Sequence, residues 1–293
     1  MNCSKKLKGG ELLELIALAR AELVKAGIEE AQEECERILM KLFGCSRSEI
    51  YLERHELISS GVREQLLRIL EKRIRRIPLA YLLNEADFWQ ETLYVDERCL
   101  VPRPETEILV EQVLKAFGKA GEMGFSFLDV GTGSGAIAIA ILRAFKHAQG
   151  TLLDISGEAL EVARKNLGHY ALEDRGKLVQ GDLFELFSQN EKWDLIVSNP
   201  PYLSEKDWEK VQEELNFEPK KALDGGKDGL DFYRKIIVEA KDHLTPGGVI
   251  AFEVGQGQAD KVSKWLQTAG YDNIQRFNDH LQVQRVVMAQ RHS

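Results

Sequence analysis

Cysteine is scarce in this chain, and its four copies lie far apart. They are Cys3, Cys35, Cys45 and Cys99. No two form a C-x-x-C pair, and no histidine stands near them at the spacing of a metal site. Disulfide-rich secreted domains and zinc modules need such clusters. We therefore expect thiols in a cytoplasmic protein and no metal ion.

Long apolar runs are also missing. The most apolar stretch, residues 136–142, is far shorter than the roughly 20 residues that cross a bilayer as a helix. The first 20 residues start basic and continue apolar, but Glu11 and Glu14 interrupt them at helical spacing and no small-residue cleavage site follows. This pattern predicts an amphipathic helix, and we expect no membrane partner.

Positive charge is in short supply. The 293 residues include 39 Lys and Arg against 47 Asp and Glu, which leaves a net charge of -8. Residues 1–85 carry net +1 and the remainder net -9. Proteins that hold a long nucleic acid through its phosphates usually present a basic surface. This balance disfavours a direct nucleic-acid partner.

The remaining composition is that of a globular protein with room for one large or two ordinary domains. From Glu11 to Arg76, apolar residues recur every three or four positions, which predicts three to five helices that end before Pro78. Residues 88–101 alternate between aromatic or β-branched and polar types, and this alternation predicts a short hairpin. We expect a helical domain at 1–84, a hairpin linker at 85–104 and a second domain at 105–293.

Strand and helix patterns alternate in the second domain. This order predicts a seven-stranded, doubly wound α/β sheet. The last two strands are too close for a helix between them, so they should form an antiparallel pair at one sheet edge. The expected strands are 126–130, 150–154, 177–180, 194–198, 248–254, 273–277 and 284–289, and the expected helices are 136–145, 158–169, 231–243 and 258–269.

A glycine-rich run follows the first of these strands. Gly131-Thr132-Gly133-Ser134-Gly135 connects strand to helix, where backbone N–H groups can approach a ligand. It fits G-x-G-x-G and also the dinucleotide pattern G-x-G-x-x-A. Asp154 ends the next strand, where a carboxylate can accept both hydroxyls of a ribose. Both patterns predict an adenosine-type ligand, whereas a turn made only for packing is the structural alternative.

The strand at 194–198 runs directly into Asn199-Pro200-Pro201-Tyr202. Two prolines remove two backbone donors and fix φ, so a rigid loop leaves carbonyl oxygens free to accept. The Asn199 side-chain oxygen and the Pro200 carbonyl can each take one N–H of an NH2 group, with the Tyr202 ring against its plane. Such positioning would help a poorly nucleophilic amide nitrogen attack an electrophile. The alternative is a rigid strand exit capped by asparagine.

These two motifs resemble those of class I S-adenosylmethionine-dependent methyltransferases that act on amino groups. Further segments resemble, more narrowly, the release factor glutamine methyltransferases of the HemK or PrmC type. The resemblance covers the chain from about residue 10 to its end, although Asn84 and Ile77 stand where that family usually has Gly and Glu. The further segments are Pro78–Leu83 with Phe88-Trp89, Val101–Glu107, Phe217–Pro219 with Ala222-Leu223, Asp228–Leu230, Pro246–Gly248 and Glu253–Gly255.

The resemblance implies methylation of the side-chain amide of the glutamine in the Gly-Gly-Gln loop of peptide chain release factors. It implies that Gly131 to Gly135 and Asp154 hold S-adenosylmethionine, with Asp182 and Leu183 near the adenine. Asn199 to Tyr202 would hold the glutamine, and Asn199 would also lie near the cofactor's methionine part. The helical part resembles the family's domain for docking release factors. We expect a monomer that uses no metal.

Three other functions stay open at this point. An amino methyltransferase for adenine or guanine could use the same Asn-Pro-Pro-Tyr loop. A non-catalytic adaptor of the translation machinery and an NAD-linked dehydrogenase are the other two. A basic cluster on the last helix expected in the helical domain at 1–84 could dock an acidic partner or form a solvent-exposed face. Its members are Arg68, Lys72, Arg73, Arg75 and Arg76.

Overall fold

The computed structural model describes residues 9–52, 60–118, 123–209 and 211–292, and the chain divides into two compact units. Unit 1 combines residues 1–84 with 213–217, and unit 2 combines residues 85–212 with 218–293. Across the described residues, no helix is long and apolar enough to cross a membrane. In the same residues, no cluster of three His, Cys, Asp or Glu side chains could hold a metal ion.

Unit 1 is a helical bundle around one apolar core. Ala19, Leu23, Ile38 and Leu66 are at most 1% exposed, and their three- and four-residue spacing along each helix brings them to the same side. The exposed faces of these helices are mostly polar, but Leu18, Val24, Leu67 and Ile74 are exposed apolar side chains. The helices are α1 (Gly9–Lys25), α2 (Ala31–Phe43), α3 (Arg47–Leu52), α4 (Ser60–Ile74), α5 (Leu79–Leu83) and the 3-10 helix η3 (Glu213–Phe217).

The bundle continues past Pro78, where the sequence pattern placed its end. Pro78 directly precedes α5, because a proline that lacks an N–H is tolerated where helical hydrogen bonding has not begun. Asn84 ends α5 in the left-handed conformation with φ 55°. Asparagine tolerates this conformation better than most residues, so Asn84 can replace a glycine there.

The basic cluster, which spans the second half of α4 and the two residues after it, is only partly exposed to solvent. Arg68 and Arg75 are exposed and pair with glutamates one helical turn away. Arg73, in contrast, is 5% exposed and pairs with Glu34 at 2.7 Å and with Glu214 at 2.9 Å. The cluster therefore holds the returning segment 213–217 inside unit 1, which neither sequence-based alternative anticipated.

The hairpin lies earlier than its predicted range of 88–101. Strands β1 (Ala86–Phe88) and β2 (Glu91–Leu93) pair antiparallel, with Trp89 at φ 59° in the turn. Pairing stops at Leu93 because the Tyr94 backbone bonds a side chain instead. Tyr94 N donates to Asn166 Oδ1 at 2.7 Å, and Asn166 Nδ2 donates to the Tyr94 carbonyl at 2.9 Å.

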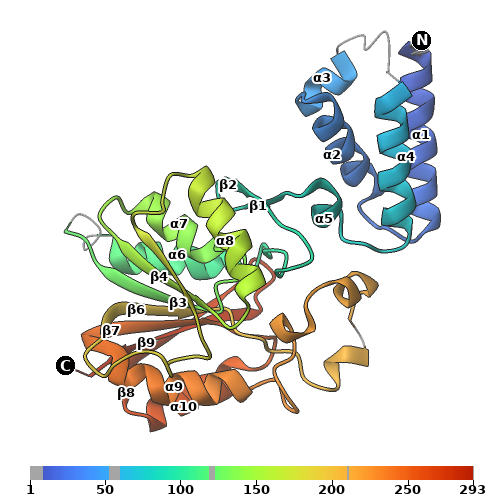
Figure 1. Cartoon of the computed structure of the whole chain (residues 1–293). Coiled ribbons are helices and arrows are strands. Elements are labelled where there is room, and N and C mark those ends of the chain that lie inside the picture. Colours follow the sequence, from blue (N-terminus) through green and yellow to red (C-terminus); the bar gives the residue numbers. More distant parts are fainter. Residues whose placement is uncertain (1–8, 53–59, 119–122, 210, 293) are drawn as a thin grey trace. The chain divides into compact units, whose positions relative to one another are not determined.

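Unit 2 is built on a seven-stranded sheet in the order β5-β4-β3-β6-β7-β9-β8 (Figure 1). The first five strands in this order are parallel, and β9 is antiparallel to both of its neighbours. The predicted doubly wound sheet with an antiparallel edge is confirmed. The strands are β3 (Ser126–Val130), β4 (Gln149–Asp154), β5 (Gly176–Gln180), β6 (Trp193–Ser198), β7 (Leu244–Glu253), β8 (Tyr271–Asn278) and β9 (Gln284–Arg291).

One strand begins well before its predicted start. Strand β7 starts at Leu244, directly after the helix α9 (Asp231–His243), rather than at Gly248. Leu244 pairs with Trp193, and the register then shifts before Leu195 meets Val249. This irregularity takes up Pro246 and Gly247, which lie before the predicted start of the strand.

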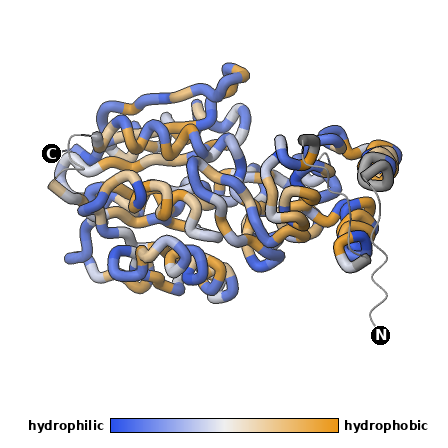
Figure 2. The backbone as a smooth tube through the Cα atoms, turned by 90° about the horizontal axis from the view of Figure 1, so that it is seen from above, coloured by the Kyte–Doolittle hydropathy of each residue, from blue (hydrophilic) through white to orange (hydrophobic). Residues whose placement is uncertain are grey.

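Helices cover both faces of the sheet (Figure 1). One face carries α6 (Thr106–Phe117), α7 (Ala136–Ala144) and α8 (Gly157–His169), and the other carries α9 (Asp231–His243) and α10 (Ala259–Thr268). Side chains alternate between the two faces along a strand. Leu195 and Val197 therefore pack in the core on the face covered by α6, α7 and α8, whereas Ile196 packs in the core on the face covered by α9 and α10. Figure 2 shows how hydrophobic and hydrophilic residues alternate along the backbone.

Candidate active site

The predicted site residues gather at one edge of the sheet. Val130, the last residue of β3, pairs with Leu153 of β4 on one side and with Ser198 of β6 on the other. The residues that follow these positions therefore leave the sheet side by side. The chain order reverses between β3 and β6, and open α/β sheets bind ligands beyond the carboxyl ends of their strands at such a point.

The glycine run turns tightly over the end of β4. Gly131 N and Thr132 N both donate to the Leu153 carbonyl, at 2.8 and 3.0 Å. Gly131 and Gly133 have φ of 74° and 56°, which favours glycine. Among the described residues, no atom lies within 4 Å of a Cβ added at either glycine. The loop thus leaves open space beside its backbone, as a ligand cradle requires.

A buried carboxyl supports this loop from below. Thr132 Oγ1 donates to Asp129 Oδ2 at 2.7 Å, and Asp129 is 0% exposed. Burial raises the pKa of Asp129 to about 7, against the opposing effect of the Thr132 hydrogen bond. Its Oδ1 has no hydrogen-bond partner among the described residues. Gly135, with φ 84°, also leaves little room for a side chain, because an added Cβ would lie 3.3 Å from Ile139 and 3.4 Å from Ala163.

Asp154 lies next to the glycine run. Its Oδ2 accepts from Gly133 N and its Oδ1 from Ser156 N, both at 2.9 Å. Burial raises the pKa of Asp154, and these backbone hydrogen bonds oppose the rise. Each carboxylate oxygen keeps a further lone pair, so Asp154 can still accept hydroxyl groups from a ligand.

Asp182 and Leu183 follow β5, the strand next to β4. Asp182 is exposed, and Leu183 adopts a positive φ of 48°. Gly181 N donates to the Asp154 carbonyl at 3.0 Å, which brings this turn beside Asp154. The structure thus places both residues on the β4 side of the glycine run, the side opposite Asn199.

Asn199 starts the loop after β6 and is bound through its nitrogen. Asn199 Nδ2 donates to Thr106 Oγ1 at 3.0 Å, and Thr106 Oγ1 donates to Glu253 Oε2 at 2.5 Å. Glu253 is 0% exposed at the end of β7, and burial raises its pKa to about 7. Glu253 Oε1 has no hydrogen-bond partner among the described residues. Because the nitrogen of the Asn199 amide faces Thr106, its oxygen faces away from Thr106.

The rest of the loop is clamped by backbone contacts. Gln258 Nε2 donates to the Tyr202 carbonyl at 3.0 Å and to the Gly229 carbonyl at 3.1 Å. A Cβ at Gly229 would come within 2.3 Å of the Tyr202 oxygen, and one at Gly225 within 2.7 Å of the Pro201 oxygen. Burial raises the pKa of Tyr202, and the negative charge of Glu253 raises it further. Its phenol therefore stays neutral at physiological pH.

The segment before α6 is fixed by a buried carboxylate. Glu218 Oε2 accepts from Val101 N at 3.0 Å, and Glu218 Oε1 pairs with Arg103. This pairing explains why the Val101–Glu107 and Phe217–Pro219 segments both carry distinctive residues. Thr106 and Glu253 also lie in such segments, but nothing local gave them a role. Gln258 had no signal in the sequence at all.

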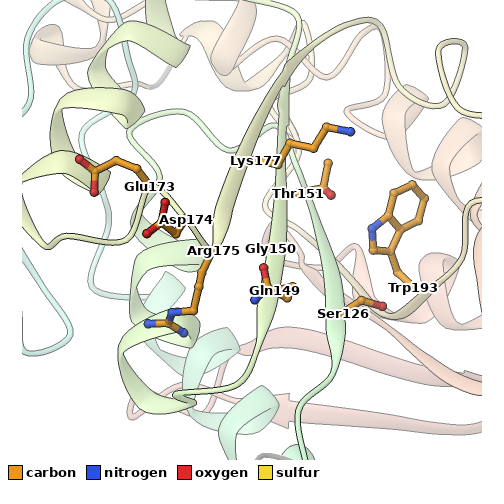
Figure 3. Close-up of a pocket in the computed structure, with 9 residues that line it drawn as sticks. All are labelled: Ser126, Gln149, Gly150, Thr151, Glu173, Asp174, Arg175, Lys177 and Trp193. Carbon is orange, nitrogen blue, oxygen red and sulfur yellow. The ribbon is translucent and has the colours of Figure 1, made fainter.

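The opposite edge of the sheet holds a pocket of about 350 Å³ (Figure 3). Its lining includes Ser126, Gln149 and Trp193, the first residues of β3, β4 and β6. Arg175 contacts it but donates to the Leu142 and Phe145 carbonyls, which end α7. This pocket is therefore far from the predicted site residues along the strands, and Arg175, one of the two basic residues that line it, has structural partners.

Comparisons with known proteins match most of the chain. The family described as "Methyltransferase small domain" matches residues 104–229, and "PrmC N-terminal domain" matches residues 14–83. A protein of Caulobacter vibrioides named release factor glutamine methyltransferase is 37% identical over 271 residues, 92% of this chain and 93% of its own. A protein of the same name from Clostridium acetobutylicum is 35% identical over 275 residues, 93% of this chain and 96% of its own.

The fold is also similar to the crystal structure of a methyltransferase from Pyrococcus furiosus. The TM-score is 0.52 at 19% identity, over 80% of this chain and all of that one. This likeness concerns the fold alone. The relatives named above, in contrast, match nearly the full length of both chains at more than 30% identity.

Proposed function

Because the chain belongs to the release factor glutamine methyltransferase family, we propose that it methylates the side-chain amide nitrogen (N5) of the glutamine in the Gly-Gly-Gln motif of peptide chain release factors. The observation that carries this proposal is the near full-length match to relatives of that name. The Asn-Pro-Pro-Tyr loop beside the glycine run supports it, because it offers acceptors for an NH2 group.

The residues present fit S-adenosylmethionine as the methyl donor. Gly131 and Gly133 leave open space beside the backbone, and the Asp154 carboxylate lies next to them. In this proposal Gly131 to Gly135 and Asp154 hold the cofactor, with Asp154 accepting the ribose hydroxyls. Asp182 and Leu183 border the adenine, and Asn199 lies near the methionine part. When bound, the cofactor supplies a sulfonium methyl group.

Asn199, Pro200, Pro201 and Tyr202 position the glutamine in this mechanism. The Asn199 oxygen and the Pro200 carbonyl each accept one N–H, so the nitrogen lone pair would be left free to attack the methyl group that the cofactor supplies. Both oxygens also stabilise positive charge that develops on nitrogen. The neutral Tyr202 ring lies against the amide plane. After transfer the nitrogen loses one of its protons to water, and no metal or covalent enzyme intermediate is required.

The helical unit docks the release factor in this proposal, and the protein works as a monomer in the cytoplasm. The match of residues 14–83 to a family domain supports a separate role for this part of the chain. Deleting residues 1–84 should raise the KM for a whole release factor more than the KM for a short Gly-Gly-Gln peptide. An equal effect on both substrates would contradict the docking role.

Mass spectrometry tests the reaction directly. A release factor is incubated with the protein and S-adenosylmethionine, and wild type is compared with Asn199→Ala. We expect one added methyl group on the Gly-Gly-Gln peptide, which the variant fails to add. If the protein methylated DNA or RNA and left the release factor unmethylated, the result would instead favour a nucleic-acid amino methyltransferase.

A further inference from the structure

Three polar groups from distant parts of the chain form a continuous hydrogen-bonded series in unit 2. Asn199 Nδ2 lies 3.0 Å from Thr106 Oγ1, which lies 2.5 Å from Glu253 Oε2. Thr106 is 4% exposed and Glu253 is 0% exposed. Thr106 is the first residue of α6, and Glu253 is the last residue of β7. We call these three residues the amide relay.

The order of donors in the relay follows from the chemistry of its groups. An ionised carboxylate only accepts hydrogen bonds, and a threonine hydroxyl has a single hydrogen to donate. Once Thr106 gives that hydrogen to Glu253, its oxygen can only accept. Asn199 must therefore turn its NH2 group towards Thr106 and its oxygen away from it.

We propose that Thr106 and Glu253 are positioning residues that fix the Asn199 side chain with its oxygen towards the substrate amide. This inference rests on the proposed function, in which that oxygen accepts an N–H of the glutamine. A flipped Asn199 amide would present a donor to a donor, and the substrate nitrogen would lose one of its two acceptors. The relay thus acts on the reaction through Asn199, and Tyr202 of the same loop also faces Glu253.

A purely structural role for the same contacts predicts different results. Thr106 also joins the start of α6 to the end of β7, so its loss could lower stability without touching the reaction. Thr245 provides a matched control, because its Oγ1 donates to Asp194 Oδ1 at 3.1 Å at the opposite end of β7. Both threonines bond a carboxylate, but only Thr106 contacts Asn199.

The experiment compares Thr106→Val, Thr106→Ser and Thr245→Val as full chains. Methyl transfer to a release factor gives kcat and KM, calorimetry gives the Kd for S-adenosylmethionine, and thermal unfolding gives Tm. We expect Thr106→Val to lower kcat by about 10- to 100-fold, with the cofactor Kd within about twofold of wild type. Thr106→Ser should restore kcat to within about threefold, because it keeps the hydroxyl. Thr245→Val should affect Tm alone.

A double-variant cycle separates action through Asn199 from any other route. In an Asn199→Ala background, Thr106→Val should cause no further loss of kcat. The inference is overturned if Thr106→Val has the same kcat as Thr245→Val, or if Thr106→Ser fails to restore kcat. It is also overturned if the losses of kcat caused by Thr106→Val and Asn199→Ala multiply in the double variant. Wild type that leaves the Gly-Gly-Gln glutamine unmethylated would overturn the proposed function and this inference with it, whereas active wild type with an unaffected Thr106→Val overturns the inference alone.

Discussion

Two buried carboxyl groups, each bound to a threonine, support the two loops of the candidate site. Asp129 lies under the glycine run, and Glu253 lies behind Asn199; both are 0% exposed, and burial raises the pKa of each to about 7. Each has one oxygen bonded to a threonine hydroxyl and one without a partner among the described residues. The same local chemistry thus occurs at the ends of β3 and β7.

The two pairs differ in how the chain brings them together. Asp129 and Thr132 are three residues apart, so a single turn forms their hydrogen bond. Thr106 and Glu253 are 147 residues apart and meet only when α6 packs beside the finished sheet. We infer that the first pair shapes a loop for the cofactor, whereas the second couples the substrate loop to the folding of the whole of unit 2.

The largest expected effect separates the two loops by their roles. Asn199→Ala should lower kcat by about 100- to 1,000-fold, because a preorganised acceptor for the substrate amide is lost. The Kd for S-adenosylmethionine should change little. Asp154→Ala should instead weaken cofactor binding by about 10- to 100-fold, as expected for the loss of one or two charge-assisted hydrogen bonds.

Calorimetry and steady-state methylation on the same preparations measure both effects. If Asn199→Ala and Asp154→Ala changed kcat and cofactor Kd to the same extent, the division between a cofactor loop and a substrate loop would be wrong. Thermal unfolding of both variants guards against loss of the fold as the cause.

The Asn-Pro-Pro-Tyr loop should also be sensitive to a side chain added at Gly229, which packs against it. Gly229→Ala places a Cβ within 2.3 Å of the Tyr202 oxygen, so the Asn-Pro-Pro-Tyr loop must shift. Gly247 has the same φ of 73°, but among the described residues no atom lies within 4 Å of its added Cβ. Both variants therefore share the conformational strain, which is about 1 kcal/mol.

We expect Gly229→Ala to lower kcat by about 10-fold or more relative to Gly247→Ala, since displacements near 1 Å at a reacting group can cost that much. The ratio of the two kcat values is the measurement. Equal kcat values would show that the loop tolerates movement and that the backbone clamp has no part in turnover.

The sequence predicted what depends on neighbours along the chain. The strand ends at Val130, Asp154 and Ser198 were all predicted, because β-branched runs stop at glycine, acidic or proline signals. Since carboxyl ends of parallel strands share one edge, the grouping of the glycine run, Asp154 and Asn199 followed from the fold class.

Contacts between distant segments were beyond the sequence. The hairpin was misplaced because Asn166, 72 residues away from Tyr94, ends its pairing. The return of residues 213–217 to the helical unit depends on Glu214 meeting Arg73, 141 residues away. Gln258 was missed for the same reason, because its partners Tyr202 and Gly229 come from two other loops. Periodicity and spacing carry no information about such pairs.

The pH dependence of turnover sharpens the comparison between the two carboxyls. Burial raises the pKa of Glu253 to about 7, and Thr106, Glu105, Arg285 and Tyr202 also face it. Below that pH the protonated carboxyl can donate to Thr106, whose hydrogen is then free for the Asn199 oxygen. The amide would flip, so kcat should fall about 10-fold between pH 8 and pH 6.

Glu253→Gln cannot titrate, so its kcat should lack this inflection. Unfolding does not explain a loss at low pH: the folded pKa lies above the ordinary value of 4.5, so between these values the folded state holds more protons and Glu253 favours folding as the pH falls. Wild type and Glu253→Gln are compared at saturating substrates from pH 6 to 8. An inflection that persists in the variant would assign it to another group.

The smallest effect concerns the local pair. Thr132→Val removes the hydroxyl that bonds Asp129, but the backbone N–H groups of Gly131 and Thr132 still donate to the Leu153 carbonyl, so the glycine run keeps its backbone anchors. We expect the Kd for S-adenosylmethionine to rise about threefold, the effect of one modest hydrogen bond, with kcat unchanged at saturation. Calorimetry gives the Kd, and Thr132→Ser should restore it. A fall in kcat with unchanged Kd would mean that the local pair also serves the substrate, and the two carboxyls would then share one role despite their different origins in the chain.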